Sequence, residues 1–358
     1  MKKSAPSTRL LRRRLTALLA VTLSAGLTAC ATPAAAPDSE SLTPAAAPVS
    51  ESLTDVTHQL SWLKITQFGG FFAGEAQGYY EEEGIAPTFV AGGNNILAWQ
   101  QVASGAALLA DEDPTLLMQA IASGEDLVAI GAVFQKSPLA IMSLSDNAIN
   151  TAADFEGKTI AYPDNGIGYL KVALEAQGVD MSKVTIVPAG ADPTQLVTGQ
   201  VDGYGGYATA QGASLELQGL KISYLYVDDL TAPSYGNVII TTRKNIEENR
   251  DLLVRFLTAT VKGYEWMNAN PDAAAAIVVN DVNPTGGLDL ATESAAAGIQ
   301  ADLIKGPNGV LRLDVDKMQK ILDALFQAGT IPAQLNAADV VDTSLLDDVY
   351  GTSTSLLK

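Results

Sequence analysis

Short apolar runs and longer amphipathic stretches alternate along the chain from about residue 56 onward. An apolar run of about four to eight residues is typical of a buried strand, and apolar positions spaced three and four apart are typical of a helix. Strands are expected at Val56–Trp62, Ala86–Val90, Ala106–Ala110 and Leu127–Phe134, and helices at Gln67–Glu83, Asn95–Ser104 and Pro114–Ser123. Such alternation predicts a mainly parallel sheet that helices cover on both faces.

A second run of the same kind begins near residue 144. Its expected strands are Thr159–Tyr162, Val184–Val187, Val201–Tyr207 and Ile222–Val227, and its expected helices are Ile167–Gln177 and Asp192–Thr198. A strand at Val238–Thr242 then precedes long helical patterns at Ile246–Asn268, Pro271–Val279, Ala291–Leu303 and Val315–Ala328. The chain thus builds one α/β unit, crosses to a second and returns to the first.

This order predicts an α/β fold with two lobes, each a mainly parallel sheet flanked by helices. Lobe 1 is expected to be discontinuous, over residues 56–143 and 236–358, and lobe 2 to span residues 144–235. Two chain crossings make such a fold a hinged clamp. Its ligand is expected in the cleft between the lobes, at the carboxyl ends of the strands.

The first thirty residues have the order of a secretory signal. Six basic residues up to Arg14 precede an apolar run at Leu15–Leu27, which is too short to span a membrane stably. Leu27-Thr28-Ala29-Cys30 resembles the bacterial lipobox, in which the cysteine thiol receives a diacylglyceryl group and the signal is cut just before it. We expect residues 1–29 to be a lipoprotein signal peptide and Cys30 to be lipidated. The alternative is an ordinary cleaved signal with an incidental cysteine.

A duplicated segment follows the cysteine. Residues 32–42 and 43–53 are two copies of an eleven-residue stretch rich in Pro, Ala and Ser, without aromatic residues or apolar periodicity. We therefore expect residues 30–55 to be a lipidated, disordered tether. Lipid and tether would hold the folded body outside the cytoplasmic membrane, where two acyl chains are enough for stable anchoring.

Charge and rare residues narrow the possible functions. Six of the 22 basic residues and none of the 40 acidic ones lie in the signal, so removing it changes the formal charge from −18 to −24. A surface this acidic argues against nucleic acid as a partner. Cys30 is the only cysteine and His58 the only histidine, so the chain has no disulfide and no evident metal cluster. We expect neither a cofactor nor a metal.

Several segments together resemble one known family. They are Leu60-Ser-Trp62, Gln67-Phe-Gly-Gly-Phe71, Gly78-Tyr-Tyr-Glu-Glu-Glu-Gly84, Asp154-Phe-Glu-Gly-Lys158, Gly199-Gln-Val-Asp202 and Tyr235-Gly-Asn237. Over about residues 56–280 the chain resembles the periplasmic binding proteins that include the sulfonate, nitrate and thiamine-pyrimidine binders. The resemblance implies a type II binding-protein fold and a monomeric solute-binding component of an ABC importer. Its partners would be a small molecule and a permease with its ATPase.

The resemblance also bears on the ligand. The cation-poor pattern after Leu60 and the tyrosine-rich second lobe are most similar to the riboflavin-binding members of the family, so riboflavin is the expected ligand. A thiamine pyrimidine precursor of the hydroxymethylpyrimidine type is the alternative. Sulfonate or nitrate is a further alternative, which the loops disfavour because Lys64 is their only cationic residue.

The candidate contacts are aromatic and polar side chains in the loops that follow the strands. A conjugated ring can stack on aromatic faces, and carboxylates and amides can hydrogen-bond to hydroxyl or amino groups. The candidates are Trp62, Gln67, Phe68, Asn94, Asn95, Trp99, Asp111, Glu112, Tyr162, Asp164, Asn165, Tyr169, Tyr204, Tyr207, Tyr235 and Asn237. A helix cap at Asp113 with Pro114 after it explains Asp113 locally but not the two acids before it.

Catalysis is the rival class of function. A fungal pyrimidine synthase shares the resemblance but uses histidine and cysteine residues, and we expect neither at an interior site of this chain. We therefore expect no enzymatic activity. A structural or adhesive surface lipoprotein is a third class, and it would not need a hinged aromatic cleft.

Overall fold

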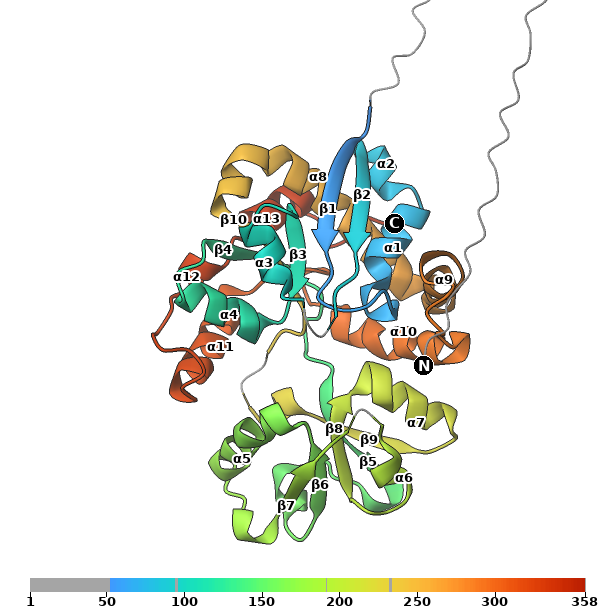
Figure 1. Cartoon of the computed structure of the whole chain (residues 1–358), viewed down its shortest axis with the longest axis vertical. Coiled ribbons are helices and arrows are strands. Elements are labelled where there is room, and N and C mark those ends of the chain that lie inside the picture. Colours follow the sequence, from blue (N-terminus) through green and yellow to red (C-terminus); the bar gives the residue numbers. More distant parts are fainter. Residues whose placement is uncertain (1–51, 94–95, 191, 232–233, 358) are drawn as a thin grey trace, which may run out of the picture. The chain divides into compact units, whose positions relative to one another are not determined.

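The computed structural model describes residues 52–93, 96–190, 192–231 and 234–357, and within these ranges the strands form two five-stranded sheets (Figure 1). The first sheet has the order β2-β1-β3-β10-β4, with β1 (Thr54–Gln59), β2 (Ile85–Val90), β3 (Leu109–Glu112), β4 (Leu127–Ala132) and β10 (Val238–Thr242). The second has the order β7-β6-β8-β5-β9, with β5 (Leu139–Leu144), β6 (Thr159–Tyr162), β7 (Thr185–Pro188), β8 (Gly203–Tyr207) and β9 (Ile222–Tyr226).

Both sheets are mixed and mainly parallel, because in each of them a single strand runs against the other four. β1 runs parallel to β2 and β3, whereas β10 runs antiparallel to β3 and β4. Likewise β6 is parallel to β7 and β8, whereas β5 is antiparallel to β8 and β9. Parallel neighbours need a crossover connection, usually a helix. β5 and β10 instead enter their sheets directly after a chain crossing, so strand–helix alternation could not predict their direction.

The chain crosses from the first sheet to the second between β4 and β5, and it returns between β9 and β10. No strand was predicted at β5, although its six-residue, largely apolar run has the length of a buried strand. All of β5 pairs with β8 or β9. The lobe boundary expected at residues 143–144 therefore divides a strand of the second sheet, and the first crossing lies before residue 139.

Helices cover the sheets in the order that the sequence predicts, with additional short ones (Figure 1). They are α1 (Gly69–Ala76), α2 (Tyr79–Glu82), α3 (Ala98–Ala103), α4 (Pro114–Ala122), α5 (Ile167–Ala176), α6 (Thr194–Val197), α7 (Ala213–Leu217), α8 (Arg243–Ala269), α9 (Pro271–Ile277), α10 (Leu290–Ile304), α11 (Val315–Gln327), α12 (Ala337–Val340) and α13 (Ser344–Tyr350). Within the described part of the chain, none of these helices has both the length and the apolarity needed to cross a bilayer.

The segment predicted as one helix at Gln67–Glu83 is divided into three. A 3₁₀ turn at Thr66–Phe68 precedes α1, and α2 follows after a break at Gly78. Gly78 has a φ of 79°, in the left-handed region, which cannot continue a right-handed helix. The break leaves Gln67 in a turn before α1 rather than on the face of a long helix.

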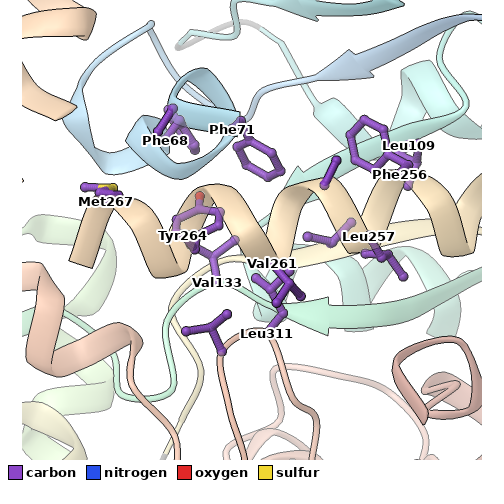
Figure 2. Packing of buried hydrophobic residues seen from close by; sticks show 14 of the residues in the cluster. Phe68, Phe71, Leu109, Val133, Phe256, Leu257, Val261, Tyr264, Met267 and Leu311 are labelled. Carbon is purple, nitrogen blue, oxygen red and sulfur yellow. The ribbon is translucent and has the colours of Figure 1, made fainter. Parts of the chain in front are cut away.

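Hydrophobic cores lie on both faces of the first sheet. Along β10, Ile239 belongs to the cluster that contains Phe71 and Phe256, whereas Val238 and Ile240 belong to the cluster on the other face. This is the period of two expected for a strand buried on both sides. Figure 2 shows residues of α8 packed beside Phe68 and Phe71.

The packing of α1 on α8 fixes the turn that carries Gln67. A Cβ atom at Gly263 of α8 would lie 2.2 Å from the carbonyl oxygen of Gly70 in α1, so the two helix backbones touch. A side chain at Gly263 would push the helices apart. The close contact of α1 with α8 therefore fixes the position of the turn that precedes α1.

Candidate functional site

Asp111 lies at the carboxyl end of β3, a central strand of the first sheet, and is fully buried. Its carboxylate accepts hydrogen bonds from the hydroxyl group of Ser61 at 2.5 Å and from the amide nitrogen of Asn237 at 3.1 Å. The backbone N–H of Ser61 also points at both carboxylate oxygens, at 3.3 Å. The protein itself thus supplies several donors to this buried charge, as a buried carboxylate requires.

His58 is the buried neighbour of this carboxylate. Its Nε2 atom lies 3.5 Å from Oδ1 of Asp111, and both side chains have no exposed surface. The imidazole lies 4.5 Å from the ring of Phe71 and stacks on Phe256 at 5.6 Å, measured between ring centroids. The expectation that no histidine occupies an interior site was wrong. Strand alternation places His58 on the same core face of β1 as Val56.

A chain of amides connects Asp111 to an opening between the two sheets. Asn237, just before β10, is 6% exposed, and its amide nitrogen also donates to the Ser61 hydroxyl oxygen at 3.0 Å. The amide nitrogen of Gln67 donates to the carbonyl oxygen of Asn237 at 2.8 Å. Three of the predicted contacts, Gln67, Asp111 and Asn237, therefore lie in one hydrogen-bonded group that we call the amide relay.

Gln67 lines a pocket of about 260 Å³ whose walls come from segments of both sheets. One wall follows β1, one follows β8 and one is the first turns of α10. The lining residues are Ile65, Gln67, Pro193, Thr209, Ala210, Gln211, Ser214, Thr292, Glu293 and Ala296. Among these described residues there is one carboxylate and no lysine or arginine. Such a lining suits an uncharged ligand that carries hydrogen-bond donors.

Most of these lining residues were not among the contacts predicted from the sequence. Glu293 is the clearest case: its Oε2 accepts from the backbone N–H of Thr66 at 2.9 Å, beside Gln67. It lies in the first turn of α10, which does not follow a strand. A search limited to loops after strands therefore could not find it. An acid in the first turn of a predicted helix was the only available signal.

Glu112 points to the opposite face of β3 from Asp111. It is 3% exposed, and it accepts hydrogen bonds from the backbone N–H groups of Asp113 at 2.9 Å and Trp99 at 3.1 Å. Burial, helped by the charges of Asp111 and Asp113, raises the pKa of Glu112 to about 7 against the lowering effect of these hydrogen bonds. Glu112 thus changes its protonation near neutral pH.

The predicted cap at Asp113 is confirmed. Its carboxylate accepts from the backbone N–H groups of Thr115 at 2.8 Å and Leu116 at 3.2 Å, with Pro114 in the first turn of α4. The charge of Asp113 also acts on Tyr207 of the second sheet. Burial raises the pKa of the Tyr207 phenol at the end of β8, and the negative charge of Asp113 raises it further.

Four predicted aromatic contacts lie in hydrophobic cores. Phe68 packs among the residues shown in Figure 2, and Tyr235 packs under α11, where its hydroxyl accepts from the backbone N–H of Asp314 at 2.7 Å. Tyr162 and Tyr204 are each 1% exposed in the core of the second sheet. The Tyr204 hydroxyl donates to the carbonyl oxygen of Gly190. None of these four side chains lines the pocket.

Other predicted contacts remain accessible. Trp62 is 38% exposed in the loop after β1, and Tyr169 is 36% exposed near the start of α5. Tyr207 and Trp99 are half-buried, and Asp164 is exposed in the 3₁₀ turn at Asp164–Gly166. That turn also contains the backbone of Asn165. Asn94, Asn95 and Cys30, with the expected signal and nearly all of the tether, lie outside the described residues.

A larger pocket of about 470 Å³ lies beside the edge strand β2. Lys64, Phe72, Glu75 and Asp281 are among its lining residues, and it shares no residue with the amide relay. We assign the site to the smaller pocket, because that one includes Gln67 and is bounded by segments of both sheets. Across the described ranges, no three His, Cys, Asp or Glu side chains are grouped closely enough to hold a metal ion.

Comparison with known proteins agrees with this architecture. The profile of a family described as NMT1/THI5 like matches residues 65–274. The formylaminopyrimidine-binding protein of Halalkalibacterium halodurans is 31% identical over 241 residues, which are 65% of this chain and 72% of that protein. The riboflavin-binding protein RibY of Chloroflexus aurantiacus is 27% identical over 260 residues, 69% of this chain and 72% of that protein.

Solved structures share the fold. The periplasmic aliphatic sulphonate binding protein SsuA of Escherichia coli has a TM-score of 0.60, covering 79% of this chain and 96% of that chain. The sequence identity is 15%, so this likeness concerns the fold alone. It confirms the predicted binding-protein fold.

Proposed function

The chain belongs to the NMT1/THI5-like family and is a solute-binding protein of ABC-type import, and we propose that its solute is an aminopyrimidine precursor of thiamine. The observation that carries this proposal is the lining of the pocket. Gln67 and Glu293 offer acceptor atoms, Thr209 and Ser214 offer hydroxyl groups, and the described lining has no cation. Amino groups on a flat ring match such a lining.

The same lining argues against a sulfonate or nitrate ligand. An anion needs a guanidinium, an ammonium or several backbone N–H groups directed at one point. Here the backbone N–H of Thr66, between the lining residues Ile65 and Gln67, already donates to the carboxylate of Glu293. A bound anion would also face that carboxylate without an intervening positive charge.

Pocket size and similarity support a pyrimidine ahead of riboflavin. A volume of about 260 Å³ suits one substituted ring better than three fused rings with a ribityl chain. Of the two relatives described above, the formylaminopyrimidine-binding protein is the more similar. This reverses the order of the two candidates expected from the sequence.

Riboflavin remains the second candidate because of the accessible aromatic rings. Trp62 and Tyr169 each keep over a third of their surface exposed. A tricyclic ring could stack on such faces, and the relative RibY binds riboflavin. Titration with both compounds separates the two candidates.

We infer that the solute leaves the protein unchanged. His58 is enclosed by phenylalanine rings and does not line the pocket. The carboxylate of Asp111 is occupied by Ser61 and Asn237. A general acid or base must lie within hydrogen-bonding reach of the substrate, and neither group faces the pocket.

We also propose the cellular arrangement that the N-terminus predicts. Residues 1–29 would be removed, Cys30 would carry lipid, and residues 31–55 would tether a monomer outside the cytoplasmic membrane. The first and second sheets would form the two lobes of a clamp that delivers its solute to a permease and ATPase. Metabolic labelling with a palmitate analogue tests the anchor: the wild-type chain should be labelled and Cys30→Ala should not.

Calorimetric titration of the full chain tests the ligand, after unfolding and refolding to remove any carried-over solute. The three titrants are formylaminopyrimidine, riboflavin and an alkanesulfonate. We expect saturable binding of the pyrimidine, since its amino groups can pair with the acceptors of the pocket. Binding of riboflavin alone would establish the second candidate, and binding of the sulfonate alone would contradict both.

A further inference from the structure

The hydrogen bonds of the amide relay all run in one direction. Asp111 accepts from the hydroxyl group and backbone N–H of Ser61 and from the amide nitrogen of Asn237. A carboxylate offers acceptor atoms only. The side of Asn237 that faces Asp111 must therefore be its NH₂ group.

The orientation of the Asn237 amide determines the orientation of the Gln67 amide. The NH₂ group of Asn237 serves both Asp111 and Ser61, so its carbonyl oxygen is left to accept on the other side. Gln67 fills that position by donating from its own NH₂ group. Because Asn237 is 6% exposed, turning either amide over would oppose two carbonyl oxygens or two NH₂ groups with little water to compensate.

The free end of the relay is the carbonyl oxygen of Gln67. Gln67 lines the pocket, and no described residue donates a hydrogen bond to its Oε1 atom. Glu293 supplies a second acceptor to the same pocket. A buried negative charge at Asp111 thus determines which atom of a glutamine, two hydrogen bonds away, a ligand can meet.

We propose that Gln67 is a specificity-determining residue that presents a fixed carbonyl oxygen to the ligand. This inference rests on the proposed function and deepens it, because the ring must carry an amino group where it meets Gln67. A ring with an oxo group at that position places two acceptors against each other and leaves both unpaired. Asp111 and Asn237 are positioning residues that hold the amide in this orientation.

Calorimetry with two matched ligands tests the inference on the full chain. The ligands are 4-amino-5-hydroxymethyl-2-methylpyrimidine and its 4-oxo counterpart. Wild type should bind the amino compound at least about tenfold more tightly, which is the effect of one unpaired buried acceptor. In Asp111→Asn the relay can run in either direction, so the preference should fall below about threefold.

A second variant keeps the test decisive if Asp111→Asn does not fold. Gln67→Leu leaves the buried carboxylate in place and removes the carbonyl, so it should also lose the preference. The control is Asp251→Asn, on an exposed part of α8, which should keep the wild-type ratio. Equal binding of the two ligands by wild type, or an unchanged ratio in Gln67→Leu, would overturn the inference while leaving the proposed function standing. Failure of wild type to bind either compound would overturn both.

Discussion

The two sheets carry different kinds of side chain near the pocket. At the end of β3 the first sheet buries Asp111 and Glu112, each held by protein donors. Along β8 the second sheet buries Tyr204 between two glycine residues, and at the end of the strand it exposes part of Tyr207. The first sheet therefore determines the positions of hydrogen-bond donors and acceptors. The second sheet determines the shape of its surface through aromatic rings that pack against the backbone.

This difference predicts that the two sides respond to different substitutions. The largest effect should come from Asp111→Leu, which removes the acceptor of Ser61 and Asn237 and the buried carboxylate beside His58. We expect the free energy of unfolding to fall by about 3–5 kcal/mol, as measured by urea denaturation. Asp251→Leu, at a site whose side chain is 88% exposed, should change it by less than about 0.5 kcal/mol. A similar loss in both variants would contradict the account.

Glu112 should make stability depend on pH. Burial raises its pKa from 4.5 to about 7, so between these values the folded protein keeps a proton that the unfolded chain releases. The contribution of Glu112 to the free energy of unfolding is therefore fully present below about pH 4.5. It decreases by roughly 3 kcal/mol as the pH rises to about 7. Denaturation at several pH values should show a flatter profile for Glu112→Gln than for wild type. Glu247→Gln, an exposed site on α8, should keep the wild-type profile.

On the second sheet, packing should matter more than charge. A Cβ atom at Gly205 would lie 2.1 Å from the ring of Tyr162, so Gly205→Ala must displace that ring at a cost of about 1–3 kcal/mol. Gly168→Ala is the matched control, because nothing lies within 4 Å of the added atom. Because Gly168 lies in helix α5, Gly168→Ala should raise the free energy of unfolding by up to about 1 kcal/mol. Thermal unfolding of both variants measures the contrast, and a stable Gly205→Ala would contradict it.

The smallest effect should be on affinity. Trp62 is exposed in the loop that leads from β1 to the pocket residues Ile65 and Gln67, and it is expected to stack on the ligand from outside that lining, so Trp62→Ala should weaken binding by about fivefold. Phe326→Ala, which removes a ring of similar exposure on α11, should leave the dissociation constant unchanged. Calorimetry on both variants decides whether Trp62 contributes to the site, and unchanged affinity in Trp62→Ala would remove it.

Local patterns predicted much of the fold. The strands at Thr159–Tyr162 and Val238–Thr242 have the expected bounds, because Pro163 follows the first and Gly236-Asn237 precede the second. The cap at Asp113 was predictable because both the cap and its partners lie within four residues. Features that depend on residues distant in the sequence were not predictable. The direction of β10 and the contact between His58 and Asp111 are set by pairing across many residues.

The site was predicted in part for the same reason. Gln67, Asp111 and Asn237 were chosen as loop residues after strands, and the structure joins them. Tyr204 was predicted as a contact because the glycines around it were expected to leave its ring free. Those glycines are strand residues that make room for rings: Gly205 accommodates Tyr162, and Gly206 lies against Tyr204. Composition alone could not distinguish a glycine in a ligand loop from one under an aromatic ring.

We propose that ligand recognition occurs in the pocket of Gln67 and Glu293 and that the amide relay controls it. The most direct test is a crystal structure of the full chain with 4-amino-5-hydroxymethyl-2-methylpyrimidine. We predict the ring in that pocket, with its amino group within about 3 Å of the Gln67 carbonyl oxygen. A ring bound instead beside Lys64 and Phe72 in the larger pocket would contradict the account.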